Sequence, residues 1–266
     1  MKKIFLTLLK VVVGLYIMIC GLLYFFQENL IFFPQKLAKS YQFSFTQSFE
    51  ELNFKASDGK ILNGLLFTVD NSKGLIFYLH GNAGSLSSWG DVASIYTNLG
   101  YDVFILDYRS FGKSEGVING QEQLFEDNQI IYNEFKKEYN EQDIIILGYS
   151  IGTGLASKLA SENEPKQLIL QAPYYSLTDM VHQRFSFIPT FILKYKFATN
   201  EYLKNCNMPI TIFHGDRDNV IPYESSVKLK KEFRDKVHLI TLKGQGHNGM
   251  TENNDYRNEL KRILIE

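Results

Sequence analysis

The chain has 266 residues, 45% of them hydrophobic, which excludes an intrinsically disordered protein and fits one large α/β domain better than two ordinary ones. Its formal net charge is −1, with 28 basic and 29 acidic residues, so no basic surplus indicates a nucleic-acid partner. The two cysteines, Cys20 and Cys206, supply neither a disulfide framework nor the spacing of zinc ligands.

An apolar segment begins near the N-terminus and continues, interrupted by Lys10, through Phe26. At about 1.5 Å per residue, the part after Lys10 is too short for a hydrocarbon core of about 30 Å, but the segment from residue 4 onward is long enough. We predict an uncleaved transmembrane helix over about residues 4–26, within an anchor that comprises residues 1–30. Lys10 then extends its amine towards the lipid headgroups.

Two other interpretations of this segment are weaker. A cleaved signal peptide fits the basic start, but no small-x-small cleavage site follows, and Ile19 stands where a lipoprotein signal at Cys20 needs a small residue. A buried core helix is disfavoured because the segment is apolar on every face. Lysines at positions 2, 3 and 10 favour a cytoplasmic N-terminus, although Lys36 and Lys39 on the other flank weaken that preference.

Strand-like and helix-like patterns alternate from residue 49 onward, after a linker over residues 31–48. Strand character is found at 51–56, 61–69, 75–79, 103–106, 144–147, 168–170, 210–213 and 237–242. Helical patterns are found at 85–98, 121–139, 151–161, 223–233 and 255–265. Asp58 and Gly59 predict a hairpin turn between the first two strands. Buried strands separated by helices predict a doubly wound, mostly parallel sheet with helices on both faces, in a domain over residues 49–266.

One interval, residues 174–207, is longer than a single crossover helix needs. Its aromatic residues are Tyr174, Tyr175, Phe185, Phe187, Phe191, Tyr195, Phe197 and Tyr202. We predict that this interval forms a small helical lid, and its aromatic character favours an apolar substrate.

A glycine-rich pentapeptide, Gly148-Tyr149-Ser150-Ile151-Gly152, follows the strand predicted at 144–147 and precedes a helical pattern. This G-x-S-x-G pattern between strand and helix is typical of a nucleophile elbow. The turn is so tight that side chains at the two glycine positions would collide with the neighbouring strand and helix. The alternative is a capping serine at a glycine-rich helix start. We predict that Ser150 is a nucleophile at the N-terminus of the following helix, where the helix dipole favours developing negative charge.

Acyl transfer also needs two backbone N–H groups that bind the oxyanion. One comes from the residue after the nucleophile, which is Ile151, and the other from the loop after the strand predicted at 75–79. That loop reads His80-Gly81-Asn82-Ala83-Gly84, and its glycines allow the backbone a close approach. We assign the second donor to Asn82, with Ala83 as the alternative, and interpret His80 as structural.

The loops after the last two predicted strands supply a candidate acid and a candidate base. Asp216 and Asp218 compete for the acid after 210–213, and we prefer Asp218. His247, which follows Gly246 after the last strand, can reach back over the sheet as the base. The other candidates are less well placed, at strand ends or in the lid: His182, His214 and His238. The resulting chain order is Ser, Asp, His, which is the order of α/β-hydrolases.

These motifs together resemble one family, the bud-emergence-type α/β-hydrolases, a group similar to protein depalmitoylases. The resemblance spans roughly residues 20 to 265 and rests on His80-Gly81-Asn82-Ala83-Gly84, residues 107–116, Gly148-Tyr149-Ser150-Ile151-Gly152, His214-Gly215-x-x-Asp218 and Gly246-His247. The resemblance implies an α/β-hydrolase fold, assigns the acid to Asp218, and implies an esterase, a thioesterase or, less often, a peptidase. It names no substrate.

We therefore expect a serine hydrolase that cleaves an ester or thioester of a hydrophobic, lipid-like acyl substrate through an acyl-enzyme, without metal or organic cofactor. The alternatives are a serine aminopeptidase-like enzyme on the same fold and a catalytically inactive scaffold. We expect a single-pass protein of the bacterial inner membrane, with the hydrolase domain on the periplasmic or outer side. The oligomeric state does not follow from the sequence.

Overall fold

The predicted strand segments form one eight-stranded sheet in the computed structural model, which describes residues 1–265. The strand order is β10-β9-β8-β7-β4-β6-β3-β2. The strands are β2 (Phe49–Lys55), β3 (Ile61–Phe67), β4 (Leu75–Leu79), β6 (Asp102–Leu106), β7 (Ile144–Tyr149), β8 (Gln167–Gln171), β9 (Ile210–Gly215) and β10 (Val237–Leu242). The six neighbouring strands from β10 to β6 in this order, including β4, are parallel. At the other edge, β3 pairs antiparallel with both β6 and β2. The predicted mostly parallel sheet is confirmed.

Both faces of the central strands are buried, and the interior positions of β4, β6, β7 and β8 are mostly apolar. On β4, Phe77 packs into the core on one face, while Ile76 and Tyr78 pack into the core on the other. Side chains alternate between the faces of a strand, so a fully apolar strand requires a helical layer on each side. The predicted hairpin joins β2 to β3, and Gly59 in its turn has a φ of +81°, which glycine adopts without strain.

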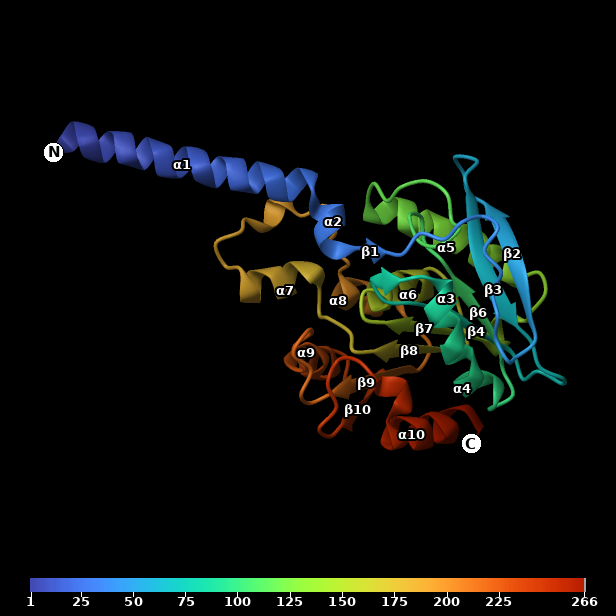
Figure 1. Ribbon diagram of the computed structural model, residues 1–266. Helices are drawn as coiled ribbons and strands as arrows, with labels where there is room; N and C mark the ends of the chain where they lie inside the picture. The colour runs from blue at the N-terminus through green and yellow to red at the C-terminus, as the bar shows by residue number, and fades with distance from the viewer. Residues whose placement is uncertain (266) are drawn as a thin grey trace.

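Helices cover the two faces as predicted (Figure 1). One face carries α5 (Gln121–Phe135), α6 (Gly152–Ser161) and α9 (Glu224–Glu232), and the other carries α3 (Leu86–Trp89), α4 (Ala93–Thr97) and α10 (Asn254–Ile265). The continuous helix predicted over 85–98 is wrong, because a 3-10 turn over Gly90–Val92 separates α3 from α4. Phe45 packs directly on Gly90, where any side chain would collide with the ring.

The interval 174–207 contains only short helical segments. They are α7 (Leu177–Arg184), η3 (Thr190–Ile192), α8 (Thr199–Tyr202) and η4 (Leu203–Asn205). Tyr195 and Phe197 are fully buried, so part of this interval belongs to the core of the domain.

The N-terminal segment consists of α1 (Lys2–Phe25), α2 (Gln27–Ile31) and the two-residue strand β1 (Phe33–Pro34). α1 is long and apolar enough to cross a membrane, has no buried residue, and projects away from the domain (Figure 1). After α1 the chain returns to the domain, where β1 pairs in parallel with β5 (Ala83–Gly84). This pairing was not predicted, since two residues carry no strand pattern.

Arg109 is a buried residue that forms two ion pairs. Its guanidinium, 2% exposed, binds both carboxylate oxygens of Asp127 at 2.6 and 2.9 Å and those of Asp58 at 2.6 and 3.0 Å. The Asp127 side chain is 3% exposed, whereas that of Asp58 is 46% exposed. The buried charge of Arg109 therefore depends chiefly on Asp127.

We expect Asp127→Ala to lower the free energy of unfolding by about 3 kcal/mol or more, because it leaves a buried guanidinium short of a partner. Asp58→Ala is the matched control and should cost less, since water can replace an exposed carboxylate. Thermal unfolding of both variants measures the difference. Equal losses would show that burial does not decide the strength of these two pairs.

Candidate active site

The turn after β7 has the geometry that its glycines predict. Ser150 has a φ of +53°, a backbone conformation that residues other than glycine rarely adopt. A Cβ at Gly148 would lie 2.7 Å from the Cβ of Ala156 on α6, and a Cβ at Gly152 would collide with the carbonyl oxygen of Leu79 on β4. Both positions therefore need glycine, because a side chain at either one would force α6 away from the sheet.

The structure brings the side chains of Ser150, His247 and Asp218 together. Ser150 Oγ lies 3.0 Å from His247 Nε2, and His247 Nδ1 lies 2.7 Å from Asp218 Oδ2. Ser150 is 7% exposed and His247 is 8% exposed, so this chain of hydrogen bonds is largely shielded from water but remains accessible. The Tyr149 hydroxyl donates to the carbonyl of His247 at 2.9 Å and holds its loop in place.

Asp218 is held as a carboxylate by four donors. Its Oδ1 accepts from the N–H groups of Val220 and Ile221, both at 2.8 Å, and its Oδ2 faces His247 and, at 3.3 Å, His214 Nε2. Burial by itself would raise the pKa of Asp218, but hydrogen bonds from His214 and His247 outweigh burial and lower that pKa below its ordinary value. The carboxylate therefore stays ionised at neutral pH.

Asp216, the alternative acid, lies elsewhere in the same loop. It is exposed, and its Oδ1 accepts from the N–H of Gly244, so it joins the loop after β9 to the loop after β10. No hydrogen bond connects Asp216 to His247 within residues 1–265. Of the two candidates, the structure places Asp218 beside the imidazole.

Sequence reasoning missed one residue of this cluster, His214, which was set aside as a strand-end histidine. His214 Nδ1 lies 2.6 Å from Ser226 Oγ, and its Nε2 lies 3.1 Å from the carbonyl of Ile221. No signal in the sequence singled it out, because His214 lies near the end of β9 as an ordinary strand residue would.

The loop between β4 and α3 carries one predicted oxyanion donor, Asn82, and the elbow after β7 carries the other, Ile151. Within residues 1–265, neither the N–H of Asn82 nor that of Ile151 donates a hydrogen bond to another group, so both are free to bind a ligand. The carbonyl of Asn82 accepts from Phe33 at 2.7 Å, and its side-chain amide donates to the carbonyl of Ile31 at 2.8 Å. The carbonyl of Ala83 accepts from Trp89 Nε1 at 2.8 Å. The N-terminal segment therefore braces this loop from outside.

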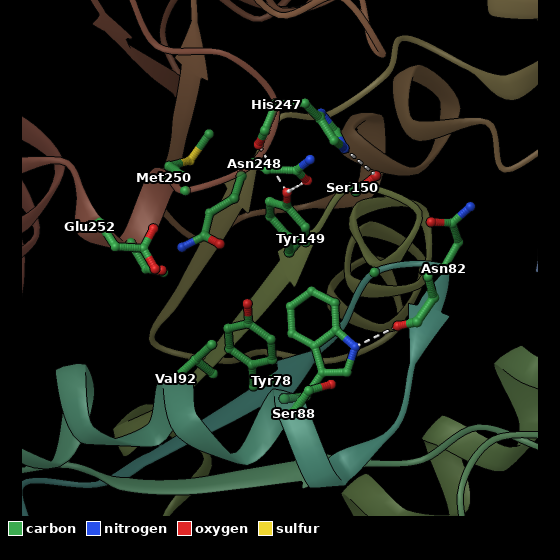
Figure 2. A pocket seen from close by; sticks show the side chains of 16 residues that line it. Tyr78, Asn82, Ser88, Val92, Tyr149, Ser150, His247, Asn248, Met250 and Glu252 are labelled. Atoms are coloured by element: carbon green, nitrogen blue, oxygen red, sulfur yellow. Dashed lines mark hydrogen bonds between the residues drawn. The ribbon is translucent and has the colours of Figure 1, made fainter. Parts of the chain in front are cut away.

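A cavity of about 320 Å³ opens beside Ser150 and His247 (Figure 2). Its walls combine aromatic, other apolar and polar side chains: Tyr78, Trp89, Val92, Tyr149, Gln171, Asn248, Met250 and Glu252. None of residues 174–207 lines it, so the interval predicted as a lid does not cover this cavity. Within residues 1–265, no group of three or more His, Cys, Asp or Glu side chains gathers as metal ligands would.

Beneath the oxyanion loop lie two buried groups, His80 and Asp107. His80 Nδ1 donates to the carbonyl of Gly81 at 2.7 Å, and its Nε2 lies 3.6 Å from Asp107 Oδ1. Burial lowers the pKa of His80 to about 4 and raises the pKa of Asp107 to about 8, although the N–H of Leu86 binds the Asp107 carboxylate and opposes that rise. His80 is therefore neutral, and its unprotonated Nε2 faces the protonated carboxyl group of Asp107.

The raised pKa of Asp107 predicts a pH dependence of stability. The unfolded chain releases this proton near the ordinary pKa of 3.8 and the folded chain only near 8, so the contribution of Asp107 to the free energy of unfolding falls as pH rises through that window. Asp107→Asn cannot ionise, and its amide can still accept from Leu86 and donate to His80. We expect the melting temperature of the variant, relative to the unmodified chain, to rise between pH 5 and pH 9. A constant or falling difference would contradict the assigned protonation.

Comparison with known proteins agrees with this architecture. A family model described as "Serine aminopeptidase, S33" matches residues 70–200. The protein named "Uncharacterized protein YfhR" of Escherichia coli (strain K12) is 28% identical over 213 residues, covering 75% of this chain and 74% of that protein. The lysophosphatidylserine lipase ABHD12 of Mus musculus is 29% identical over 225 residues, which cover 72% of this chain and 55% of the lipase.

Two solved structures have a similar fold. The esterase Pf2001 of Pyrococcus furiosus superposes with a TM-score of 0.69 at 18% identity, covering 88% of this chain and 96% of that one. Est1E of Butyrivibrio proteoclasticus superposes with a TM-score of 0.65 at 18% identity, covering 81% of this chain and 99% of that one. The sheet order, the elbow after β7 and these similarities show that the chain has the α/β-hydrolase fold.

Proposed function

We propose that the protein is a serine hydrolase that cleaves the ester or thioester of a hydrophobic acyl substrate through an acyl-enzyme. The observation that carries the proposal is the continuous hydrogen-bonded chain from Ser150 through His247 to Asp218 in the wall of a cavity. A serine that is merely structural needs neither an imidazole within 3.0 Å nor a strained elbow.

Each step of this mechanism has a group in position. His247 Nε2 takes the proton of Ser150 Oγ as the oxygen attacks the acyl carbon, and Asp218 holds the imidazole in the required tautomer. The N–H groups of Asn82 and Ile151 bind the oxyanion, each donor contributing about 10²- to 10³-fold in rate. His247 then protonates the leaving group, and the same imidazole activates the water that releases the acyl group.

The motif order and the named lipase relative support a finer assignment, to the bud-emergence-type group and to lipid-like substrates. A series of p-nitrophenyl esters of increasing chain length, measured beside acyl-thioesters on the full chain, tests this assignment. We expect hydrolysis of esters or thioesters and a preference for longer acyl chains. Activity on neither bond type would contradict the proposal.

A second candidate is a peptidase, as the description of the matched family model suggests. The structure adds one relevant feature, because Glu252 is a carboxylate on the cavity wall that could bind a free amine (Figure 2). Aminoacyl p-nitroanilides distinguish the two functions: cleavage that Glu252→Gln abolishes would favour the peptidase, while ester hydrolysis that this variant leaves unchanged favours the esterase.

We also propose that α1 is an uncleaved anchor that leaves the N-terminus in the cytoplasm and the catalytic domain across the bacterial inner membrane. We expect the protein to resist extraction with alkaline carbonate, because an apolar helix of 24 residues inserts stably. We expect a C-terminal alkaline phosphatase fusion to be active and a cytoplasmic reporter to be inactive. The reverse reporter pattern would overturn the orientation, and release by carbonate would overturn the anchor.

A further inference from the structure

Three exposed phenyl groups follow α7 within seven residues, two in the loop before η3 and one in η3 itself. Phe185, Phe187 and Phe191 are 48%, 64% and 85% exposed, and none of them lines the cavity beside Ser150. Single apolar side chains are common on protein surfaces, but several on one short loop indicate contact with an apolar partner. The remaining question is which partner.

The same loop is bonded to the N-terminal anchor and lies alongside α1 (Figure 1). The hydroxyl of Tyr16, on α1, donates to the carbonyl of Phe187 at 2.7 Å. Gln27, at 5% exposure, donates to the carbonyl of Ile192 at 2.8 Å and accepts from the N–H of Lys194 at 2.9 Å. The amide of Gln27 thus binds the backbone just beyond the phenyl groups at two points, so the loop and the anchor form one unit.

The length of α1 determines how deep this loop lies. Its 24 residues measure about 36 Å, compared with about 30 Å of hydrocarbon. Tyr16 lies nine residues before Phe25 (25 − 16), about 14 Å from that end of α1. If the whole excess of about 6 Å lies outside the membrane at this end, Tyr16 is still about 8 Å inside the hydrocarbon boundary. Interfacial segments bury their apolar side chains to a similar depth, about 5–10 Å.

We propose that the loop from Phe185 to Phe191 docks on the membrane that holds α1, with its three phenyl groups among the acyl chains of the adjacent leaflet. The partner of this loop is a lipid bilayer, because the loop is bonded to the segment that we assign to the membrane. At the depth of that bond, the surrounding groups are lipid acyl chains. The inference rests on the anchor role of α1 given under the proposed function.

Docking at this loop orients the active site. Arg184, directly before the loop, donates to the carbonyls of Asn219 and Val220 at 2.8 Å each, beside Asp218. On the other side, the Asn82 amide binds the end of α2. The loop with the acid and the loop with the oxyanion donors are thus both attached to the membrane-docked segments. The substrate class that suits this arrangement is an amphipathic ester whose acyl chain already lies in the bilayer.

Quenching by brominated lipids tests insertion without requiring activity. Phe191→Trp in the full chain is reconstituted in phosphatidylcholine vesicles with brominated acyl chains. Ile265→Trp is the matched control, because Ile265 is an exposed residue at 47% on α10, remote from α1 (Figure 1). We expect emission from position 191 to be strongly quenched, and emission from position 265 and from the native Trp89 to be little affected. Equal quenching of the tryptophans at positions 191 and 265 would overturn the proposal and would favour a protein as the partner of this loop.

A substrate comparison tests the consequence for catalysis. In the triple variant Phe185→Ser/Phe187→Ser/Phe191→Ser, we expect hydrolysis of a long-chain ester dissolved in the vesicle to fall roughly tenfold, equivalent to about 1.4 kcal/mol. Hydrolysis of p-nitrophenyl acetate in solution should stay unchanged. A parallel loss on both substrates would contradict a membrane role for the loop.

Labelling of Ser150 by a fluorophosphonate in detergent separates this proposal from the proposed function. Retained labelling in the triple variant shows that the fold and the nucleophile are intact, so any selective loss in vesicles belongs to the loop. Absence of labelling in the unmodified chain would instead refute the hydrolase mechanism, and the quenching result would stand independently.

Discussion

Ser150→Ala is expected to abolish labelling by a fluorophosphonate probe and to lower kcat by about 10⁴-fold or more. The hydroxyl of Ser150 is the group that forms the acyl-enzyme in the proposed mechanism, and no other hydroxyl among residues 1–265 bonds to the imidazole ring of His247. The residual rate would come from the oxyanion donors and from substrate binding, which do not depend on Oγ.

The substitution should leave the fold intact. Among residues 1–265, Ser150 Oγ bonds only to His247 Nε2, and alanine tolerates the positive φ of the elbow no worse than serine does. Ser157→Ala is the matched control, because it removes a buried hydroxyl without a hydrogen-bond partner from α6, the same helix that the elbow begins. Undiminished labelling of Ser150→Ala, with the control also labelled, would falsify the assignment of the nucleophile.

Asp218→Asn is expected to lower kcat by about 10³- to 10⁴-fold with little change in KM, and the structure supplies the reason. The N–H groups of Val220 and Ile221 both point at Oδ1, so the amide oxygen must take that position. The amide NH₂ then faces His247 Nδ1. Because an NH₂ group only donates, it forces Nδ1 to accept and moves the imidazole proton to Nε2, which can no longer accept the proton of Ser150.

Asp216→Asn should retain most of the activity. An asparagine oxygen can still accept from the N–H of Gly244, and the side chain is exposed, so we expect a small change in melting temperature and a change of less than about tenfold in kcat. Both variants are measured on one ester. If Asp216→Asn were the inactive variant, the acid would be assigned to the wrong residue.

His214 is a second histidine that faces the carboxylate of Asp218. His214 Nε2 lies 3.3 Å from Asp218 Oδ2, the same oxygen that His247 faces. His214 therefore contributes to the lowered pKa of Asp218 without contacting Ser150. It therefore acts as a positioning residue for the acid. No local pattern distinguishes such a histidine from an ordinary strand-end histidine, because its role depends on where the loop returns.

The sequence alone was sufficient for those features whose cause is local. The strand at 75–79 is an unbroken apolar run, the strand at 237–242 is mostly apolar, and β4 and β10 have these same bounds in the structure. The elbow was readable because Gly148 and Gly152 are required by contacts with the strand and helix on either side of them. Chain order then placed Ser150, Asp218 and His247 at the ends of parallel strands, which meet at one edge of the sheet.

Other features depended on contacts between distant segments, and only the tertiary structure decided them. Three such contacts join residues far apart in the chain. They are the pairing of β1 with β5, the ion pairs of Arg109, and the two bonds of Gln27 to the backbone of Ile192 and Lys194. Such contacts form only when the whole domain packs. A two-residue strand or a single glutamine has no periodic pattern from which these contacts could be predicted. The sequence identified the groups suited to the chemistry, whereas packing determined that the loop with Asn82 and the segment from Phe185 to Phe191 are both attached to the N-terminal segment.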